Sequence, residues 1–206
     1  MRRTGLAASS CSSPQARHSA SARPRATARP RAAAEALPFG ERQFDAAMAL
    51  WTIHHWADPG KGIAELRRVA RRVVIVTASD RLNQLWLIRD YFPAIAFLRP
   101  EIQPGRIAAL LGGDARIQPF PVPRDCLDGF GEAFWARTEA YLDPRIRAGI
   151  SAFTLRSEAE IGPGLQQLQA DLRSGAWDAR NGGLRQLPEF DCGLRLVIAT
   201  GTGTAA

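Results

Sequence analysis

Hydrophobic positions along the chain occur with two different spacings. Residues 44–51, FDAAMALW, form a nearly continuous apolar run of strand length, and residues 73–78, VVIVTA, form a β-branched one. Such runs are typical of parallel strands that are buried on both faces. Between them, Ile63, Leu66 and Val69 recur at helical spacing. The pattern therefore predicts a β-α-β unit, for which a right-handed crossover is expected.

The predicted helix begins at Asp58-Pro59. Aspartate accepts hydrogen bonds from the free N–H groups of a first helical turn, and proline is tolerated at the first helical position. We expect the helix to continue through GKGIAELRRVARR, residues 60–72. Glu65, Arg67 and Arg68 are then expected on its solvated face, where charged side chains pair locally.

The later segments predict a mixture of helices and strands. Residues 83–98, NQLWLIRDYFPAIAFL, are rich in large apolar side chains but are interrupted by Pro93, which suits an insertion or cap better than a regular strand. The other expected elements are a glycine-closed helix at 106–113, an edge strand at 115–123, helices at 132–142 and 157–175, and a final strand at 192–200. The predicted fold class is therefore α/β.

The two ends of the chain differ from this pattern. Residues 1–34 are a low-complexity mixture of Ala, Arg, Ser and Pro without apolar periodicity, so we expect a disordered basic tail. Three interpretations remain open: a plain extension or a wrongly assigned start, an organelle transit peptide, and an arm that binds nucleic acid. The folded domain is expected over residues 35–200, followed by a C-terminal tail over residues 201–206.

Charge and cysteine content narrow the possible partners. The tail holds seven arginines and no acid, whereas the remaining residues hold 20 basic and 20 acidic side chains, so nucleic-acid binding by the folded part is not expected. The three cysteines are widely spaced, which argues against a disulfide framework or a zinc ribbon and suits a reducing cytosol. No uninterrupted apolar run approaches the roughly 20 residues that span a bilayer. We therefore expect a cytoplasmic protein without a metal or membrane partner.

One segment carries a family resemblance. Residues 34–71, AEALPFGERQFDAAMALWTIHHWADPGKGIAELRRVAR, are followed by the strand VVIVT. This combination resembles the later part of class I S-adenosylmethionine-dependent methyltransferases, in the branch called methyltransferase type 11. The resemblance covers roughly residues 34–200. It implies a Rossmann-like sheet, S-adenosylmethionine as the co-substrate, and methyl transfer to a small-molecule acceptor.

The sequence also departs from that family. Its members open with a strand that ends in a glycine-rich loop, and an acidic residue one strand later takes the ribose hydroxyls. Neither pattern occurs before Leu37. About 80 residues, at about 30 per β-α-β step, are therefore expected to be missing. TGTGT, residues 200–204, has too few residues after it to replace the glycine loop.

An incomplete sheet of later strands only has consequences for function. The 44–51 strand would present an unpaired edge, through which the chain could self-associate. The chain alone is then expected to bind S-adenosylmethionine weakly or not at all. A non-catalytic remnant or partner-binding protein is the alternative function, and nucleic-acid binding through the tail is a third.

The expected cofactor site lies where ligands of α/β sheets bind, beyond the carboxyl ends of the strands. By resemblance, the ALPF loop and the end of the first strand supply its residues: Ala34, Glu35, Ala36, Leu37, Leu50 and Trp51. The family often has an aspartate where this chain has Ala33, so the usual acceptor for the adenine amino group is replaced. The alternative is that Leu37-Pro38-Phe39 only packs a turn.

His54 and His55 follow the same strand. A zinc site needs three or four ligands, and the only other histidine is in the tail, so a metal site is not expected. An imidazole can instead act as a general base or orient the acceptor near neutral pH. A structural histidine that caps the strand or helix is equally compatible with the sequence. Of the two, we interpret His55 as the one that faces the site.

Three aromatic residues are candidates for a substrate pocket. By resemblance these are Trp56, Trp86 and Tyr91. The alternative for each is packing in the hydrophobic core, which is the more frequent environment of clustered aromatic side chains.

Overall fold

The computed structural model describes residues 6–8, 32–97 and 99–200, which form two compact units. Unit 1 consists of the described parts of Met1–Thr77, Arg99–Gln118 and Leu196–Ala206. Unit 2 consists of those of Ala78–Leu98 and Pro119–Arg195. Each unit is therefore assembled from segments that are distant in the sequence.

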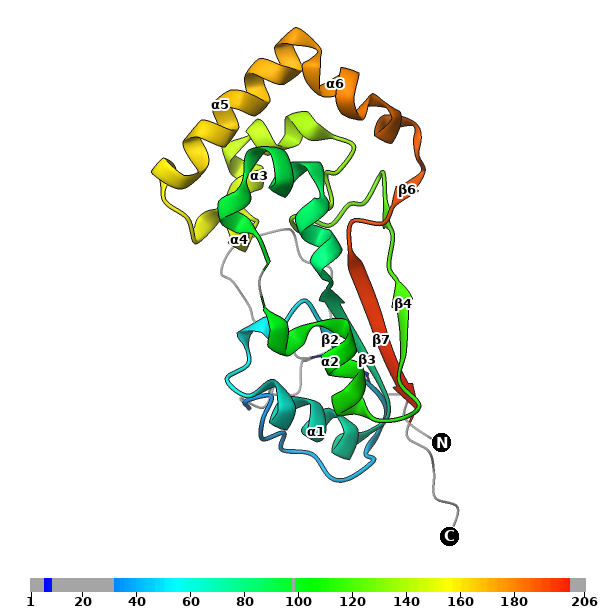
Figure 1. Ribbon diagram of the computed structural model, residues 1–206. Coiled ribbons are helices and arrows are strands. Elements are labelled where there is room, and N and C mark those ends of the chain that lie inside the picture. Colours follow the sequence, from blue (N-terminus) through cyan, green and yellow to red (C-terminus); the bar gives the residue numbers. More distant parts are fainter. Residues whose placement is uncertain (1–5, 9–31, 98, 201–206) are drawn as a thin grey trace, which may run out of the picture. The chain divides into compact units, whose positions relative to one another are not determined.

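A five-stranded sheet with the order β1-β2-β3-β7-β4 supports unit 1. Its strands are β1 (Leu6–Ala8), β2 (Phe44–Leu50), β3 (Ala70–Ala78), β7 (Leu194–Thr200) and β4 (Arg116–Pro119). The first three are parallel, and Figure 1 shows the arrow of β7 running opposite to that of β3. The α/β class and the two parallel strands of the predicted β-α-β unit are confirmed. Burial on both faces was wrong for β2, in which only Ala47 and Ala49 are buried.

The edge of β2 is covered by a strand that the sequence pattern did not predict. β1 lies parallel to β2, with Leu6, Ala7 and Ala8 opposite Ala46, Ala47 and Met48. The expected unpaired edge was therefore wrong over these three residues, because backbone groups from the N-terminal segment pair with it. The prediction of a disordered tail otherwise falls mainly on residues 1–5 and 9–31, and that for TGTGT on residues 201–204, which lie outside the described residues.

Helix α1 (Pro59–Val69) begins as predicted and ends earlier. Asp58 Oδ1 accepts a hydrogen bond from the Lys61 N–H at 3.0 Å. The predicted continuation to residue 72 was wrong, because Ala70–Arg72 join β3 and pair with Phe44–Ala46 of β2. The ladder bonds to β2 outweigh a further helical turn whose arginines have no apolar face to bury.

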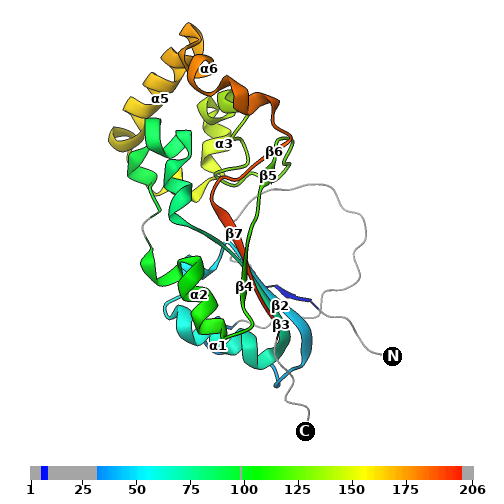
Figure 2. The same ribbon diagram turned by 45° about the vertical axis from the view of Figure 1, so that its right-hand side comes forward.

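The core of unit 1 lies between the sheet and its two helices. α1 and α2 (Pro104–Leu111) lie side by side on one face of the sheet (Figures 1 and 2). Their buried positions recur at helical spacing and meet buried residues of β2 and β3: Ile63, Leu66, Val69, Ile107, Leu111, Ala47, Ala49, Val73 and Ile75. α2 ends at Gly112, whose φ of +96° is in the region that favours glycine, so the predicted glycine-closed helix is confirmed. The short helix η5 (Pro100–Ile102) precedes it.

Unit 2 is mainly helical, with one small antiparallel sheet. The sheet pairs β5 (Val122–Pro123) with β6 (Glu189–Phe190). The long helix α5 (Glu158–Ser174) begins with a capping box of Ser157 and Glu160 and meets α6 (Ala176–Asn181) at Gly175. The shorter helices are η2 (Asp80–Gln84), η3 (Leu87–Tyr91), η4 (Pro93–Ile95), η6 (Thr138–Leu142), α3 (Pro144–Ala148), α4 (Ser151–Thr154) and η7 (Gly182–Gln186).

Two predicted elements take other forms. The edge strand expected at 115–123 is split into β4, which does lie at the sheet edge, and β5, which belongs to the other sheet. Residues 132–136 form turns and not a helix. Side chains in and next to this segment bond to distant carbonyl groups: Trp135 Nε1 donates to Val122 O at 2.9 Å, and Nη2 of the following Arg137 donates to Cys126 O at 2.6 Å. These tertiary bonds override the local helix propensity.

The core of unit 2 is built from aromatic rings. Trp86 is buried, and its ring centroid lies 5.2 Å from that of Trp177, 5.8 Å from Tyr141 and 5.9 Å from Tyr91, each in an edge-to-face arrangement. Its indole N–H donates to Trp135 O at 3.0 Å. Aromatic pairs prefer this geometry, and each buried polar tip needs a partner.

The close approach of α5 to η3 at Gly164 allows a test of this packing. A Cβ there would lie 2.1 Å from Tyr91 O and 2.8 Å from the Phe92 ring. We expect Gly164→Ala to destabilise the protein by about 1–3 kcal/mol, the usual result of overpacking. Urea unfolding measures the change, and Gly183→Ala is the control, because nothing lies within 4 Å of the Cβ added there. Equal stability of the two variants would contradict the described contact.

Candidate functional site

The carboxyl end of β2 has three unusual features. Leu50 is a large apolar residue with 47% of its surface exposed. Trp51 has φ +50°, a region that bulky residues seldom adopt and that is frequent at functional sites. The buried hydroxyl of Thr52 has no hydrogen-bond partner among the described residues. An apolar surface beside an unsatisfied donor is suited to a ligand that is partly apolar and partly polar.

The segment of Ala34–Leu37 is fastened next to α1. Glu35 Oε1 accepts a hydrogen bond from the N–H of Asp58 at 3.1 Å, at the start of the helix. The N–H of Leu37 donates to Glu65 Oε2 at 2.8 Å, two turns further along. Unit 1 therefore brings together the predicted adenine-bordering loop and the helix that follows β2.

Arg68 completes this attachment with four hydrogen bonds. Its Nε and Nη2 donate to the two carboxylate oxygens of Glu65 at 2.6 and 2.7 Å. Nη1 donates to Phe39 O at 2.7 Å, and Nη2 also donates to Leu37 O at 3.0 Å. The bond from Arg68, together with the bond from Leu37 N–H, lowers the pKa of Glu65 to about 2. The expectation of a solvated, locally paired face was therefore incomplete, because the pair also holds the loop.

His54 and His55 lie in the short helix η1 (Ile53–His55), after β2 has ended. Their ring centroids are 4.0 Å apart, and His55 is exposed. Burial lowers the pKa of His54 to about 4, with further contributions from the nearby His55 and Arg99. Arg99 Nη1 donates to the backbone oxygen of His54 at 3.1 Å. The His54 imidazole is consequently neutral near pH 7, and as such it is a weak base.

The three candidate pocket residues lie in different surroundings. Trp56 belongs to unit 1 and packs its ring on α1 at Gly62, where an added Cβ would lie 2.3 Å from the ring. Trp86 and Tyr91 belong to unit 2 and are buried in its aromatic core. Trp86 also lines a cavity of unit 2, so this residue both packs in the core and forms part of a pocket wall.

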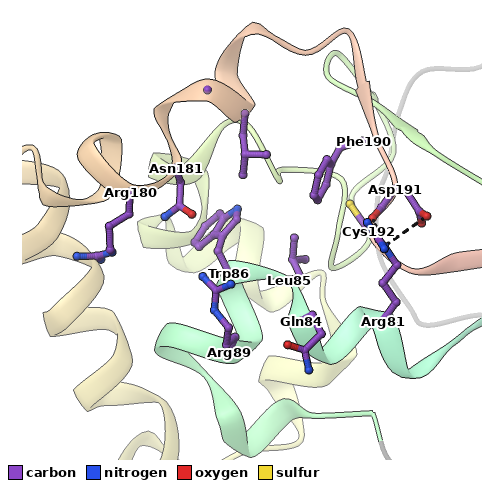
Figure 3. A pocket seen from close by; sticks show the side chains of 12 residues that line it. Arg81, Gln84, Leu85, Trp86, Arg89, Arg180, Asn181, Phe190, Asp191 and Cys192 are labelled. Atoms are coloured by element: carbon purple, nitrogen blue, oxygen red, sulfur yellow. Dashed lines mark hydrogen bonds and ion pairs between the residues drawn. The ribbon is translucent and has the colours of Figure 1, made fainter.

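A cavity of about 470 Å³ lies within unit 2 (Figure 3). Its charged and apolar side chains come from three segments: the η2–η3 region, the end of α6, and the residues before β7. The charged members are Arg81, Arg89, Arg180 and Asp191, and the apolar members include Leu85, Trp86, Leu184 and Phe190. This size and lining are typical of small-molecule sites. Sequence reasoning found only Trp86 of these residues, because the three segments are far apart along the chain.

Tyr91 is part of a network that connects α5, α6 and η3 beside this cavity. Its hydroxyl donates to Asp171 Oδ2 at 2.7 Å and accepts from Arg180 Nη2 at 2.7 Å. Arg180 also pairs with Asp171, whose other oxygen accepts from Gln167 at 2.7 Å. Burial and the bond to Asp171 raise the pKa of Tyr91 to about 12, so its hydroxyl remains protonated. These contacts give Tyr91 a structural role.

Glu132 is a buried carboxyl group in the same unit. Burial raises its pKa to about 7. Its charge in turn contributes to the raised pKa of the Tyr141 hydroxyl and of the Cys192 thiol, and Cys192 lines the cavity. A carboxyl with such a pKa changes charge near neutral pH. No pattern along the chain indicated this burial, since an isolated glutamate looks like any solvated residue.

The described residues contain neither a metal-binding cluster nor a membrane-spanning helix. Across the described residues, no three His, Cys, Asp or Glu side chains gather as they would around a metal ion. No helix in the described parts of the chain is both long and apolar enough to cross a membrane.

Comparison with solved structures identifies the family. A protein named as a methyltransferase from an antibiotic biosynthesis pathway of Anabaena variabilis is 34% identical, with a TM-score of 0.71. The match covers 81% of this chain and 70% of that one. The chain belongs to the class I methyltransferases of the type 11 branch. The model of the methyltransferase domain matches residues 3–76, so it includes most of the N-terminal segment in which we found no family pattern.

Other methyltransferase-like structures are more distant. The YcgJ protein of Bacillus subtilis is 20% identical over 82% of this chain and 68% of its own, with a TM-score of 0.38. A protein of Anaeromyxobacter dehalogenans named as a type II methyltransferase is 22% identical over 82% of this chain and 67% of its own, with a TM-score of 0.36. The search of curated proteins gave no match.

Replacement of Arg68 tests whether its guanidinium, which donates from three nitrogens, holds the loop. Lysine presents its donors from one nitrogen and cannot reproduce the four bonds. We expect Arg68→Lys to raise hydrogen exchange of the segment 35–40 about tenfold, the effect of losing roughly one charged hydrogen bond. Mass spectrometry of exchange-labelled peptides measures this, with the exposed Arg72→Lys as the control. Unchanged exchange in the Arg68 variant would show that the loop is held by other contacts.

The raised pKa of Glu132 predicts a pH-dependent stability. Well below the ordinary value of 4.5, the carboxyl is protonated in the folded and in the unfolded protein, and its contribution to stability is fully present. The contribution is lost as the pH rises from there through about 7, because the unfolded chain ionises Glu132 freely whereas the folded protein must hold either the proton or a buried charge. Glu132→Gln should match the parent at about pH 4 and exceed it by roughly 2–3 kcal/mol at about pH 8. Urea unfolding at both values tests this, and a constant difference would contradict it.

Proposed function

We propose that this methyltransferase-family protein transfers a methyl group from S-adenosylmethionine to a small-molecule acceptor. Membership of the family carries the proposal, and the features at the end of β2 support it. The sulfonium supplies an activated methyl group when S-adenosylmethionine is bound, so the protein mainly has to align the acceptor with it. The chain's own residues then have three tasks: to hold the adenosyl part, to orient the acceptor and to exclude water.

The residues at the end of β2 fit the adenosyl part. Leu50 offers exposed apolar surface, and the Thr52 hydroxyl is a buried donor that still needs an acceptor. Ala34–Leu37 would border the same ligand, because the bonds to Glu65 and Asp58 hold this loop beside α1. A fixed loop loses little conformational freedom when a ligand binds, which favours affinity.

The histidine pair suits an orienting role. With its pKa lowered to about 4, the neutral His54 can accept or donate a hydrogen bond but is a weak general base at pH 7. His55 is the exposed member of the pair. We assign to His55 the contact with the acceptor and to His54 the support of its ring at a centroid distance of 4.0 Å.

Ligand-detected NMR tests the proposed cofactor site. Saturation-transfer spectra of S-adenosylmethionine with the full chain should show transfer to the adenine and ribose protons, and S-adenosylhomocysteine should abolish it. Absence of transfer at millimolar ligand would refute the proposal. The sequence pattern alone led to the opposite expectation, that this chain binds S-adenosylmethionine weakly or not at all, and the same spectra decide between that expectation and the proposal.

A single hydroxyl locates the site. Thr52→Val removes a buried group that has no partner in the described part of the chain, so the fold should be unaffected. The dissociation constant for S-adenosylmethionine should rise about three- to tenfold, as expected for one hydrogen bond. Thr154→Val, at an exposed threonine of unit 2, is the matched control. An unchanged constant for Thr52→Val would exclude this hydroxyl from the site.

A further inference from the structure

Cationic side chains outnumber anionic ones in the lining of the cavity in unit 2, and each of the three arginines also pairs with a carboxylate. Three arginines line it, against the single carboxylate of Asp191. Arg81 pairs with that carboxylate, with a distance of 3.4 Å between its Nε and Asp191 Oδ2. Arg89 is bonded to Asp90 through Nε and Nη2, at 2.5 and 2.7 Å, and these bonds leave Nη1 uncommitted. A guanidinium with a further N–H to offer is a good partner for an anion.

Asn181 adds an unsatisfied donor to the same lining. Its Nδ2 is buried and has no hydrogen-bond partner in the described structure. Figure 3 shows its side chain at the end of α6 beside Trp86, with the amide oxygen on the side of the Trp86 ring and the nitrogen on the other side. Buried polar groups in native proteins are almost always bonded, so each exception requires an explanation. Rotation of the amide about its last side-chain bond turns Nδ2 toward the cavity, and a ligand oxygen that accepts from it there provides one.

The apolar part of the lining sets the shape of the ligand. Trp86, Phe190, Leu85 and Leu184 provide rings and branched side chains, and Trp86 is fixed by its own bond to Trp135 O. Rigid aromatic surfaces favour a planar apolar body. A volume of about 470 Å³ accommodates a molecule of one or two rings.

We infer that this cavity binds a small organic acid, in which a carboxylate is attached to a planar apolar body. The carboxylate accepts from Asn181 Nδ2 and Arg89, and the planar body lies against Trp86 and Phe190. The nearby Asp191 disfavours a doubly charged group such as a phosphate ester. Binding of the acid is independent of the proposed methyl transfer.

A matched series of probes tests the charge of the ligand. We would titrate the full chain with 4-fluorobenzoate, 4-fluorobenzamide, 4-fluorobenzylammonium and 4-fluorophenyl phosphate, and follow the fluorine signal by NMR. The acid should bind at least ten times more tightly than the amide, and the ammonium should not bind. Equal binding of the acid and the amide, or tighter binding of the phosphate ester, would overturn the inference.

Variants then locate the site. Asn181→Leu removes an unsatisfied donor, so it should leave the stability unchanged or raised and weaken binding of the acid about tenfold. Arg89→Gln should reduce the preference for the acid over the amide, whereas the exposed Arg173→Gln serves as the control. Unfolding curves exclude loss of fold as the cause. Unchanged affinity in both site variants would place the acid elsewhere and refute the inference.

Failure here is distinguishable from failure of the proposed function. The acid probes report on unit 2 without S-adenosylmethionine, and the saturation-transfer spectra report on S-adenosylmethionine without an acid. If the cofactor binds and the acid does not, the inference about this cavity fails and the proposed function stands. If only the acid binds, the cavity is an acid-binding site and methyl transfer is not supported.

Discussion

The bonded pair of Glu65 and Arg68 is the interaction on which the candidate site of unit 1 depends. One carboxylate holds both a helix arginine and a loop amide, and the arginine uses its remaining donors on the carbonyl groups of Leu37 and Phe39. Most loops leave such groups to water. Here they are fixed to a helix whose own start is held by Glu35 through the Asp58 N–H. The loop, the helix and the end of β2 are therefore positioned together.

Each candidate site contains a buried polar atom that has no hydrogen-bond partner among the described residues. Many other buried polar side chains have partners even when they are far apart in sequence, as Tyr91 and Asp171 do, although Arg137 Nε and Trp177 Nε1 also have none in the described part of the chain. The hydroxyl of Thr52 and the amide of Asn181 have none among the described residues. Folding does not account for their burial, because an apolar residue of the same shape would be at least as stable there. Binding of a polar ligand is the explanation that we propose for these two groups.

The sequence predicted those features that depend on local pattern. The strand at Phe44–Leu50, the cap at Asp58 and the glycine after α2 follow from periodicity and backbone chemistry, and the structure has all three. It could not predict the turns at residues 132–136, since distant carbonyl groups decide them, or β1, whose short segment is stabilised only by pairing with β2. The loop of Ala34–Leu37 was found through the family resemblance. The cavity of unit 2 was missed, because its lining converges only after folding.

The interleaving of the two units limits how this protein can have changed over time. The chain leaves unit 1 after Thr77, returns at Arg99, leaves again after Gln118 and returns at Leu196. No single continuous stretch therefore encodes either unit, and neither could be gained or exchanged by one recombination event. Point substitutions within the existing segments remain the accessible route. A family built in this way is expected to diversify its ligands by altering side chains such as Asn181 and Arg89 while the connectivity of the chain stays constant.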